Sequence, residues 1–404
     1  MAGLAFKDEV LDAQLLRLLG TATYGGAEVG ECMSVARAVK GTDLDSWFEA
    51  WSRMAQAVAS IGEQQQAAGH IQSAWLAYQR ACGYHRTAGV MLMGVPLDAR
   101  LVDANARQTE MFRRATALMR PAPEIVEIPF EGVSLPGYFF AAAADGRARA
   151  TVILTGGYDG TAEELYFANG AAALDRGYNV LAFDGPGQGA TLIQRGLPLR
   201  ADWESVVAAV LDHALARPDV DARRVALIGL SLGAHLAARA ASAEQRLAAC
   251  VADCGAYDLD EAFLARLPRP LAGGFARGRR RTRAAVAELM SVLMRRPTAG
   301  WAIRRGLLAH GVREPLEMVD ALREFTLSGR AQHIACPTWV CSAQDDDIGA
   351  SAPQLVEQLT CEKVYVRFTR AEGAGDHCEA GARSLYHARS FGWLDELLRP
   401  REVA

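Results

Sequence analysis

The first 120 residues carry apolar positions at helical spacing. Four such positions share one helix face, and two aspartates precede them as candidate caps. These are Trp47, Trp51, Met54 and Val58, after Asp43 and Asp45. Further helices are expected over 71–82 and 104–119, and strand-like runs begin only after the prolines of PAPEIVEIPFEG. The pattern predicts a helical N-terminal domain over residues 1–122.

From residue 124, short apolar runs alternate with helical segments. EIVEIPF and SLPGYFF are expected to pair as an antiparallel hairpin. The later strands are expected at 150–155, 178–184, 224–229, 247–253, 337–343 and 363–369, and the helices at 163–176, 202–216, 232–243 and 382–398. Alternation at this spacing is typical of βαβ units, and it predicts an α/β fold whose mostly parallel sheet is flanked by helices.

This alternation stops over residues 258–330, where the chain is helical and rich in arginine. The sheet domain is therefore expected over 123–257 and 331–404, with 258–330 as a helical cap insertion. Arg277, Arg279, Arg280, Arg281 and Arg283 cluster in the insertion. They are interpreted either as a solvated helix face or as a site for an anionic substrate or a carrier-bound phosphopantetheine.

Composition narrows the function class. The formal net charge of -4 and pI near 6.1 argue against nucleic-acid binding. The N-terminus lacks the apolar core of a signal peptide, and no apolar run is long enough for a membrane span, so a cytoplasmic protein is expected. Among eight cysteines, Cys250 and Cys254 form a CxxxC pair without a second pair. We therefore expect buried free thiols and no zinc site.

The nucleophile motif G-x-S-x-G occurs as Gly229-Leu230-Ser231-Leu232-Gly233. It follows an apolar strand and precedes an alanine-rich helix, which is the context in which a strained turn exposes a serine hydroxyl. The glycines beside the serine avoid steric clashes in this turn. The sequence thus predicts Ser231 as a nucleophile, against the alternative of an ordinary strand–helix turn with a chance serine.

A serine hydroxyl needs a base and an orienting acid, which follow it in the order acid, then histidine. His377 lies in a glycine-rich loop after the last predicted strand. Three consecutive aspartates, Asp345 to Asp347, follow the strand before it, and Asp346 is predicted as the acid because it stands two residues before Ile348. Asp253, at the end of an earlier strand, is the alternative acid.

An acyl-transfer site also needs amide donors for a developing oxyanion. The N–H of Leu232 is one expected donor, and the loop after strand 150–155 supplies the other from Tyr158, with Gly157 as the near alternative. Asp159 is interpreted either as a pocket residue or, with Glu163 and Glu164, as part of an acidic helix start.

Two weaker features remain. The loop Asp184-Gly-Pro-Gly-Gln-Gly189 lacks the spacing of a dinucleotide or phosphate motif, so no cofactor is expected. In the N-terminal helices, His70, Tyr84 and His85 are candidate substrate contacts, with structural packing as the alternative.

These motifs resemble the α/β-hydrolase group that contains 2,6-dihydroxypseudooxynicotine hydrolase and the fungal polyketide chain-shortening hydrolases. The resemblance rests on GGYDGTAEELYF, FDGPGQG, GLSLGAHLAARAA, DDDIGASAPQL, AEGAGDHCEAGARSLYHARSFGWLDEL and the N-terminal SWFEAWSRMA and GHIQSAWLAYQRACGYHR. It implies a triad of Ser231, Asp346 and His377, and an N-terminal helical region that covers the site and aids dimerisation. Some relatives have a glutamate in the oxyanion loop, where this chain has Asp159.

The expected function is therefore hydrolysis by a serine nucleophile. The substrate would be a small molecule of polyketide or alkaloid type, cleaved at a C–C bond next to a ketone or at an ester. One alternative is an acyltransferase or ring-forming cyclase acting on an ester or thioester, which shares the acyl-enzyme. The other is a hydrolase-fold binding protein without catalysis, which the presence of all three triad residues disfavours.

Overall fold

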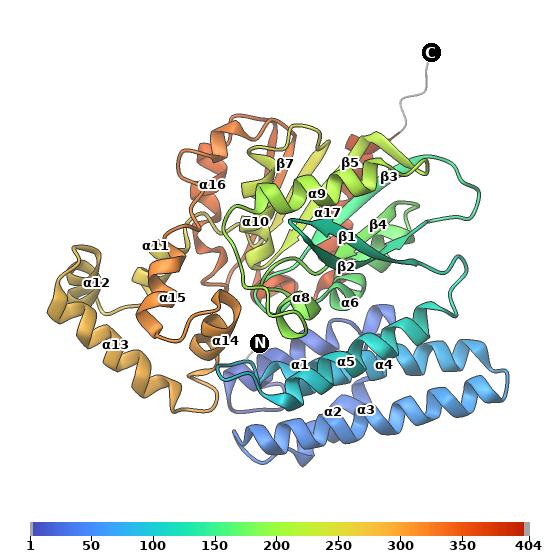
Figure 1. Cartoon of the computed structure of the whole chain (residues 1–404), viewed down its shortest axis with the longest axis horizontal. Coiled ribbons are helices and arrows are strands. Elements are labelled where there is room, and N and C mark those ends of the chain that lie inside the picture. The colour runs from blue at the N-terminus through green and yellow to red at the C-terminus, as the bar shows by residue number, and fades with distance from the viewer. Residues whose placement is uncertain (1–2, 400–404) are drawn as a thin grey trace. The chain divides into compact units, whose positions relative to one another are not determined.

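A computed structural model describes residues 3–399, which divide into two compact units (Figure 1). The helical unit comprises residues 3–118, 186–201 and 258–326, and the sheet unit comprises residues 119–185, 202–257 and 327–399. The first two and last five residues of the predicted domains lie outside the described residues. The helical unit thus unites the N-terminal helices, the insertion and a short segment from the middle of the chain.

The predicted N-terminal helical region is confirmed, and it contains five α-helices in the described residues. They are α1 (Glu9–Leu19), α2 (Val29–Ala38), α3 (Leu44–Ala67), α4 (Ile71–Val90) and α5 (Ala99–Thr116). Asp43 caps α3, because its side chain accepts hydrogen bonds from the N–H groups of Asp45 and Ser46. Trp47 and Trp51 are fully buried. No helix in the described part of the chain is both long and apolar enough to cross a membrane.

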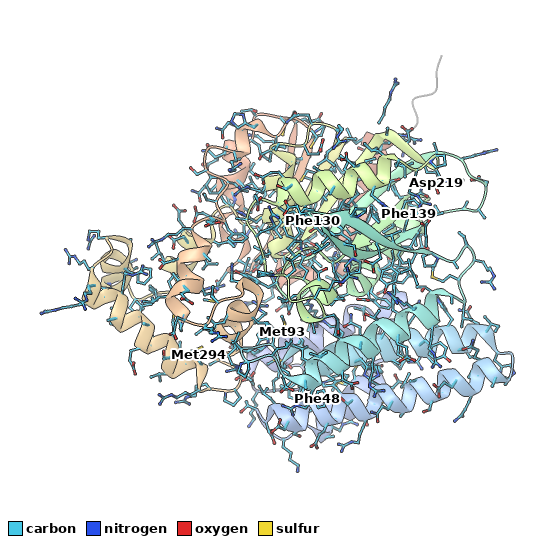
Figure 2. All side chains as sticks on the ribbon, viewed as in Figure 1. Phe48, Met93, Phe130, Phe139, Asp219 and Met294 are labelled. Atoms are coloured by element: carbon cyan, nitrogen blue, oxygen red, sulfur yellow. The ribbon has the colours of Figure 1, made fainter. Side chains whose placement is uncertain are left out.

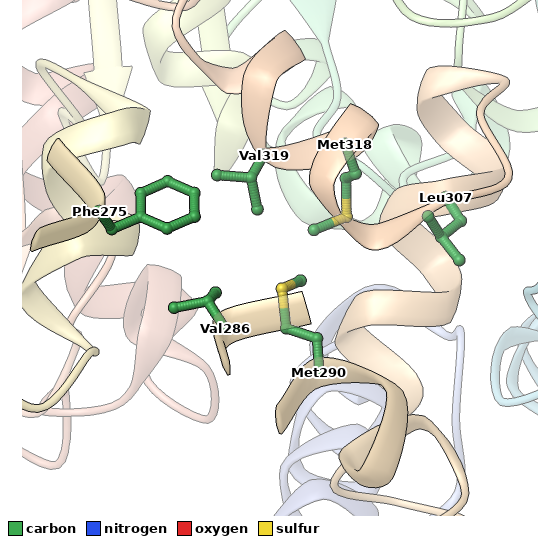
Figure 3. Close-up of a cluster of buried hydrophobic side chains, with 6 residues drawn as sticks. All are labelled: Phe275, Val286, Met290, Leu307, Met318 and Val319. Carbon is green, nitrogen blue, oxygen red and sulfur yellow. The ribbon is translucent and has the colours of Figure 1, made fainter. Parts of the chain in front are cut away.

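The insertion contributes five more helices to the same unit. These are α11 (Leu259–Ala265), α12 (Arg269–Ala276), α13 (Arg280–Met294), α14 (Trp301–His310) and α15 (Pro315–Leu322). Figure 3 shows their own core, in which Phe275, Val286 and Val319 are fully buried. Trp301 Nε1 donates to the carbonyl of Val90 at 2.8 Å, which joins the insertion to α4. The short helix α8 (Gly189–Ile193), which the pattern did not predict, completes this unit.

The sheet unit contains eight strands in the order β1-β2-β4-β3-β5-β6-β7-β8. They are β1 (Glu124–Phe130), β2 (Val133–Phe140), β3 (Arg149–Thr155), β4 (Asn179–Phe183), β5 (Val220–Leu230), β6 (Ala249–Asp253), β7 (Thr338–Ala343) and β8 (Lys363–Phe368). The β1–β2 and β2–β4 pairs are antiparallel and the others are parallel. The predicted α/β fold is confirmed, including the hairpin.

Helices cover both faces of this sheet (Figure 1). One layer holds α9 (Trp203–Leu215), α10 (Leu232–Ala241) and α16 (Ala352–Gln358), the last of which was not predicted. An ion pair between Arg239 and Glu204 joins α10 to α9. The other layer holds α17 (Arg383–Leu398) and the segment 162–174. At the sheet end labelled by Phe139 and Asp219 in Figure 2, the Arg217 guanidinium stacks on Phe139 and binds Asp219.

The helix predicted over 163–176 is interrupted, so that prediction was wrong in detail. A π-helical turn, Tyr166–Gly170, separates α6 (Ala162–Leu165) from α7 (Ala171–Leu174). The carbonyl of Ala168 accepts hydrogen bonds from Arg383 and His387, and Asn169 Oδ1 accepts another from Arg383. These tertiary bonds satisfy the Ala168 carbonyl and Asn169 Oδ1 at the irregular turn, and periodicity alone does not reveal them.

Candidate active site

Ser231 occupies the turn between β5 and α10 in a backbone conformation with φ 63° and ψ −129°. Non-glycine residues rarely adopt positive φ. The neighbouring glycines make the turn possible, since a Cβ at Gly229 would overlap the carbonyl of Gly233, and one at Gly233 would overlap that of Thr155. The Ser231 N–H also donates to the Asp253 carbonyl at 3.1 Å. The serine is thus held at the carboxyl end of the central strands.

The imidazole of His377 reaches this serine. Its Nε2 lies 2.8 Å from Ser231 Oγ, although the two residues are 146 positions apart in the chain. His377 begins a short turn after β8, in which Cys378 and Glu379 both have positive φ, 51° and 49°. The side chain of His377 is 40% exposed, so the imidazole ring is only partly buried.

Asp346 binds the other ring nitrogen, with 2.8 Å between its Oδ2 and His377 Nδ1. Its side chain is 2% exposed, and its Oδ1 accepts the N–H of Ile348 at 2.9 Å. The two adjacent aspartates are exposed, and Asp345 pairs with Arg370 instead. The structure therefore brings Ser231, His377 and Asp346 into one hydrogen-bonded chain, and it engages the alternative acid Asp253 with Arg383.

The electrostatics of this chain favour a charged Asp346 and a basic His377. Burial by itself raises the pKa of Asp346, but the charge and hydrogen bond of His377 lower that pKa below its usual value. Burial lowers the pKa of His377, yet the nearby Cys378 and the carboxylate of Asp346 together raise it well above the usual 6.5. When the imidazole is neutral, such a pair holds one tautomer, with the proton on Nδ1 beside Asp346 and a lone pair on Nε2 facing the serine.

The predicted oxyanion loop lies against the serine. A Cβ on Gly157 would be 3.0 Å from Ser231 Cβ and 3.1 Å from the Leu232 nitrogen, so only a glycine fits there comfortably. Leu232 is the first residue of α10 and is buried. Tyr158 and Asp159 follow Gly157 and are half-buried. The backbone of this loop and the start of α10 therefore meet beside Ser231 Oγ.

The acidic residues after this loop have structural partners. Glu163 is buried and accepts a hydrogen bond from Tyr138 Oη at 2.9 Å. Thr161 caps α6, because its Oγ1 accepts the N–H of Glu164. Asp184, from the glycine-rich loop, accepts the N–H of Ala162 at 2.7 Å. These contacts favour the interpretation of Glu163 and Glu164 as a helix start.

The candidate contacts from the N-terminal helices are engaged within the helical unit. His70 is exposed and its Nδ1 lies 2.8 Å from Gln65 Oε1. Tyr84 is fully buried and donates to Glu31, and burial lowers the pKa of the buried His85 to about 4. The burial of Tyr84 and His85 agrees with the packing alternative stated above, whereas His70 makes its contact with Gln65 on an exposed part of the helical unit.

The arginine cluster of the insertion is mostly solvated. Arg283 binds Asp320, with 2.6 Å between Nη2 and Oδ2. The other members, Arg277, Arg279, Arg280 and Arg281, are exposed. These positions agree with a solvated helix face.

Sequence reasoning missed a buried polar cluster behind the histidine turn. Asp253 and Arg383 form an ion pair, Glu379 lies 3.7 Å from Arg383 Nη1, and Cys341 Sγ contacts both carboxylates. Burial and the neighbouring Asp253 raise the pKa of Glu379 well above its usual value. The available signals were the i, i+4 spacing of Glu379 and Arg383 and an aspartate ending an apolar strand.

The thiols of Cys254 and Cys378 lie beside His377, a second feature that the sequence did not indicate. Cys378 Sγ is 3.5 Å from His377 Nε2, and Cys254 directly follows β6. All eight cysteines are free thiols, as predicted, and seven of them are buried.

Known proteins resemble this chain over nearly its whole length. The alpha/beta hydrolase family model matches residues 151–385, and a model described as esterase FrsA-like matches residues 37–259. The 20-hydroxy-prefusarin hydrolase FUS2 of Gibberella moniliformis is 34% identical, with 96% of this chain and 97% of that protein aligned. The alpha/beta hydrolase psoB of Aspergillus fumigatus is 38% identical, with 97% and 94% aligned.

Solved structures agree on the fold. The 2,6-dihydroxy-pseudo-oxynicotine hydrolase has a TM-score of 0.75 at 23% identity, with 94% of this chain and 96% of that chain covered. The predicted resemblance is confirmed by the family models, the fungal relatives and this fold. The chain belongs to the α/β-hydrolase family and is a hydrolase.

Proposed function

We propose that this hydrolase uses Ser231 as its nucleophile, His377 as its base and Asp346 as the orienting acid. The observation that carries the proposal is the continuous hydrogen-bonded chain from Ser231 Oγ through both nitrogens of His377 to Asp346, with 2.8 Å at each step. This is the geometry that general-base activation of a serine requires. The positive φ of Ser231, at a strand–helix turn, supports the same role.

The proposed reaction proceeds through an acyl-enzyme. Ser231 Oγ attacks a substrate carbonyl as its proton moves to His377 Nε2. The oxyanion that forms accepts hydrogen bonds from the N–H of Leu232 and from that of Tyr158 or Gly157. Collapse breaks the bond to the leaving group, which takes the proton from His377. Water, deprotonated by the same imidazole, then releases the acid and restores Ser231.

The bond proposed to break is a C–C bond next to a ketone, or an ester, in a polyketide-type small molecule. A C–C bond can break by this route only when the departing carbon is stabilised as an enolate or a phenol-type carbanion, because His377 protonates it only after departure begins. The relative named a 20-hydroxy-prefusarin hydrolase supports a secondary-metabolite substrate. An ester needs no such stabilisation, since its alkoxide oxygen takes the proton from His377 and leaves as an alcohol.

A covalent probe tests the serine directly. A fluorophosphonate should label the native protein once, at Ser231, and should not label Ser231→Ala, while Ser205→Ala labels normally as a matched control. With a β-diketone or an aryl ester as substrate, product masses should sum to the substrate plus one water. Labelling at another residue, or turnover by Ser231→Ala near the native rate, would refute the proposed mechanism.

We also propose, from the family resemblance, that two copies associate through the N-terminal helices. Light scattering of the full chain should give twice the chain mass of 43.4 kDa. A monomeric mass across a concentration series would contradict this association. The result does not bear on the serine mechanism, because the three side chains of the proposed triad come from one chain.

A further inference from the structure

Two thiols lie beside the imidazole ring of His377. Cys378 Sγ lies 3.5 Å from His377 Nε2. Cys254 supplies a second sulfur, and the two sulfurs and a ring nitrogen of His377 all lie within 4.8 Å of one another. Neither thiol is one of the three side chains of the proposed triad, although the Cys254 thiol also hydrogen-bonds to Asp346. Two sulfurs and one imidazole are a donor set that zinc and cadmium favour.

The spacing of these atoms fits a tetrahedral ion. Zn–S bonds of about 2.3 Å and Zn–N bonds of about 2.0–2.1 Å place a sulfur and a nitrogen ligand roughly 3.6 Å apart. The observed 3.5 Å between Cys378 Sγ and His377 Nε2 matches that separation. An ion between them would therefore need little movement of these two residues.

The surroundings also prepare the imidazole as a ligand. Asp346 holds Nδ1 at 2.8 Å, which leaves the lone pair on Nε2. A carboxylate behind a histidine is the usual outer partner in zinc sites. The ring is 40% exposed, so an ion can approach along it although Cys254 is fully buried and Cys378 is only 9% exposed.

We propose that Cys254, Cys378 and His377 form a binding site for one Zn²⁺ or Cd²⁺ ion that inhibits the enzyme. Binding forms two metal–thiolate bonds and one metal–nitrogen bond, and the two thiols release two protons to solvent. The Nε2 lone pair is then committed to the metal and cannot accept the proton of Ser231. A water or Ser231 Oγ fills the fourth position. The inhibitory effect rests on the proposed function, whereas the binding itself does not.

A second group of ligand atoms lies nearby but suits an ion less well. Asp253, Cys341 and Glu379 also approach within 4.8 Å of one another. All three are buried, and Asp253 is held by the cation of Arg383 at 2.8 Å, which opposes another positive charge. Cys341→Ala therefore serves to separate the two groups.

Cadmium titration tests the site without requiring turnover. We expect one Cd²⁺ per chain with an ultraviolet thiolate-to-cadmium absorption band. Cys254→Ser and Cys378→Ser should each weaken binding by more than the roughly 10–100-fold that loss of an outer partner costs. Cys361→Ser, a partly exposed thiol outside the site, and Cys341→Ala should bind as the native protein does. Cadmium NMR of the native chain, which needs no variant, should report two sulfur ligands.

Several results would overturn the site: no thiolate band, a band that survives in both serine variants, or one that is lost in Cys341→Ala alone. Fluorophosphonate labelling separates this proposal from the preceding one. Labelling of Ser231 without metal tests the serine mechanism, and its block by Cd²⁺ in the native protein but not in Cys254→Ser tests the inhibition. If labelling fails while the band needs both cysteines, the metal site stands and the serine mechanism falls.

Discussion

Arg383 forms an ion pair with Asp253, with 2.8 Å between Nη1 and Oδ2, and neither side chain is more than 8% exposed. Asp253 ends β6 and its carbonyl receives the N–H of Ser231, while Arg383 begins α17 and also binds the carbonyl of Cys378. The pair therefore links the turn that carries the serine to the turn that carries the histidine. It also explains why Asp253 is unsuited to be the acid of His377.

Replacing Arg383 with methionine should destabilise the protein strongly. The change leaves the Asp253 carboxylate buried without its cation, and breaking a buried pair in this way costs about 3–5 kcal/mol. The free energy of unfolding from denaturant titration measures it. Arg389→Met is the matched control, since Arg389 pairs with Glu372 at the surface and such pairs contribute about 0–1 kcal/mol. Equal losses in both variants would contradict the importance of the buried pair.

Asp346→Asn should reduce kcat by about 10⁴-fold, the size expected when the acid of a triad can no longer hold the histidine tautomer. Asp345→Asn should leave kcat near the native value, because Asp345 is exposed and binds Arg370. Steady-state kinetics of the two variants, which differ by one position, measure the difference. A larger loss of kcat in Asp345→Asn than in Asp346→Asn would show that Asp346 is not the acid.

Activity should fall on acidification with a midpoint above pH 6.5. In the proposed mechanism His377 must be neutral to accept the serine proton. Cys378 and Asp346 raise the pKa of His377 above 6.5, so the active form is present above that raised pKa and is lost below it. The dependence of kcat/KM on pH measures this midpoint. In Asp346→Asn the midpoint should shift to lower pH, since the carboxylate no longer stabilises the imidazolium. A kcat/KM that does not fall on acidification, or a midpoint that Asp346→Asn leaves unshifted, would contradict this role for His377.

Gly157→Ala should lower kcat by about 10²–10³-fold, the cost of losing one oxyanion donor. The added Cβ would lie 3.0 Å from Ser231 Cβ, so the loop has to move away from the serine. Gly392→Ala is the control, because nothing lies within 4 Å of a Cβ there and alanine favours a helix such as α17. Full activity in Gly157→Ala would contradict the proposal that this loop donates a hydrogen bond to the oxyanion.

Much of the fold was predictable because strand and helix periods leave local marks in a sequence. The strained turn at Ser231 was predictable because it needs glycines at fixed positions, whereas the role of Ser231 as nucleophile stays a prediction. The choice among the three aspartates was harder, because it depends on which side chain the turn after β7 directs inward. Here Asp346 turns toward His377 and Asp345 toward Arg370.

Other features could not be predicted because they depend on contacts between distant segments. Glu379 in a glycine-rich loop has the appearance of a surface charge, yet it is fully buried beside Asp253, 126 positions earlier. The pairing of Cys254 with Cys378 likewise follows only from the approach of β6 to the turn after β8. The π-helical turn is likewise hydrogen-bonded at the Ala168 carbonyl by Arg383 and His387, which lie more than 200 positions later.

The junction between β5 and α10 consists of Ser231 alone, with strand on one side and helix on the other. We expect a one-residue connection to tolerate neither insertion nor deletion, since either would move the Ser231 hydroxyl away from His377 Nε2, which lies 2.8 Å from it. Length variation, the commonest way in which loops diversify during evolution, is therefore closed to this part of the chain. New substrate preferences are therefore expected to arise by changes in other segments, while the connection at Ser231 keeps its length.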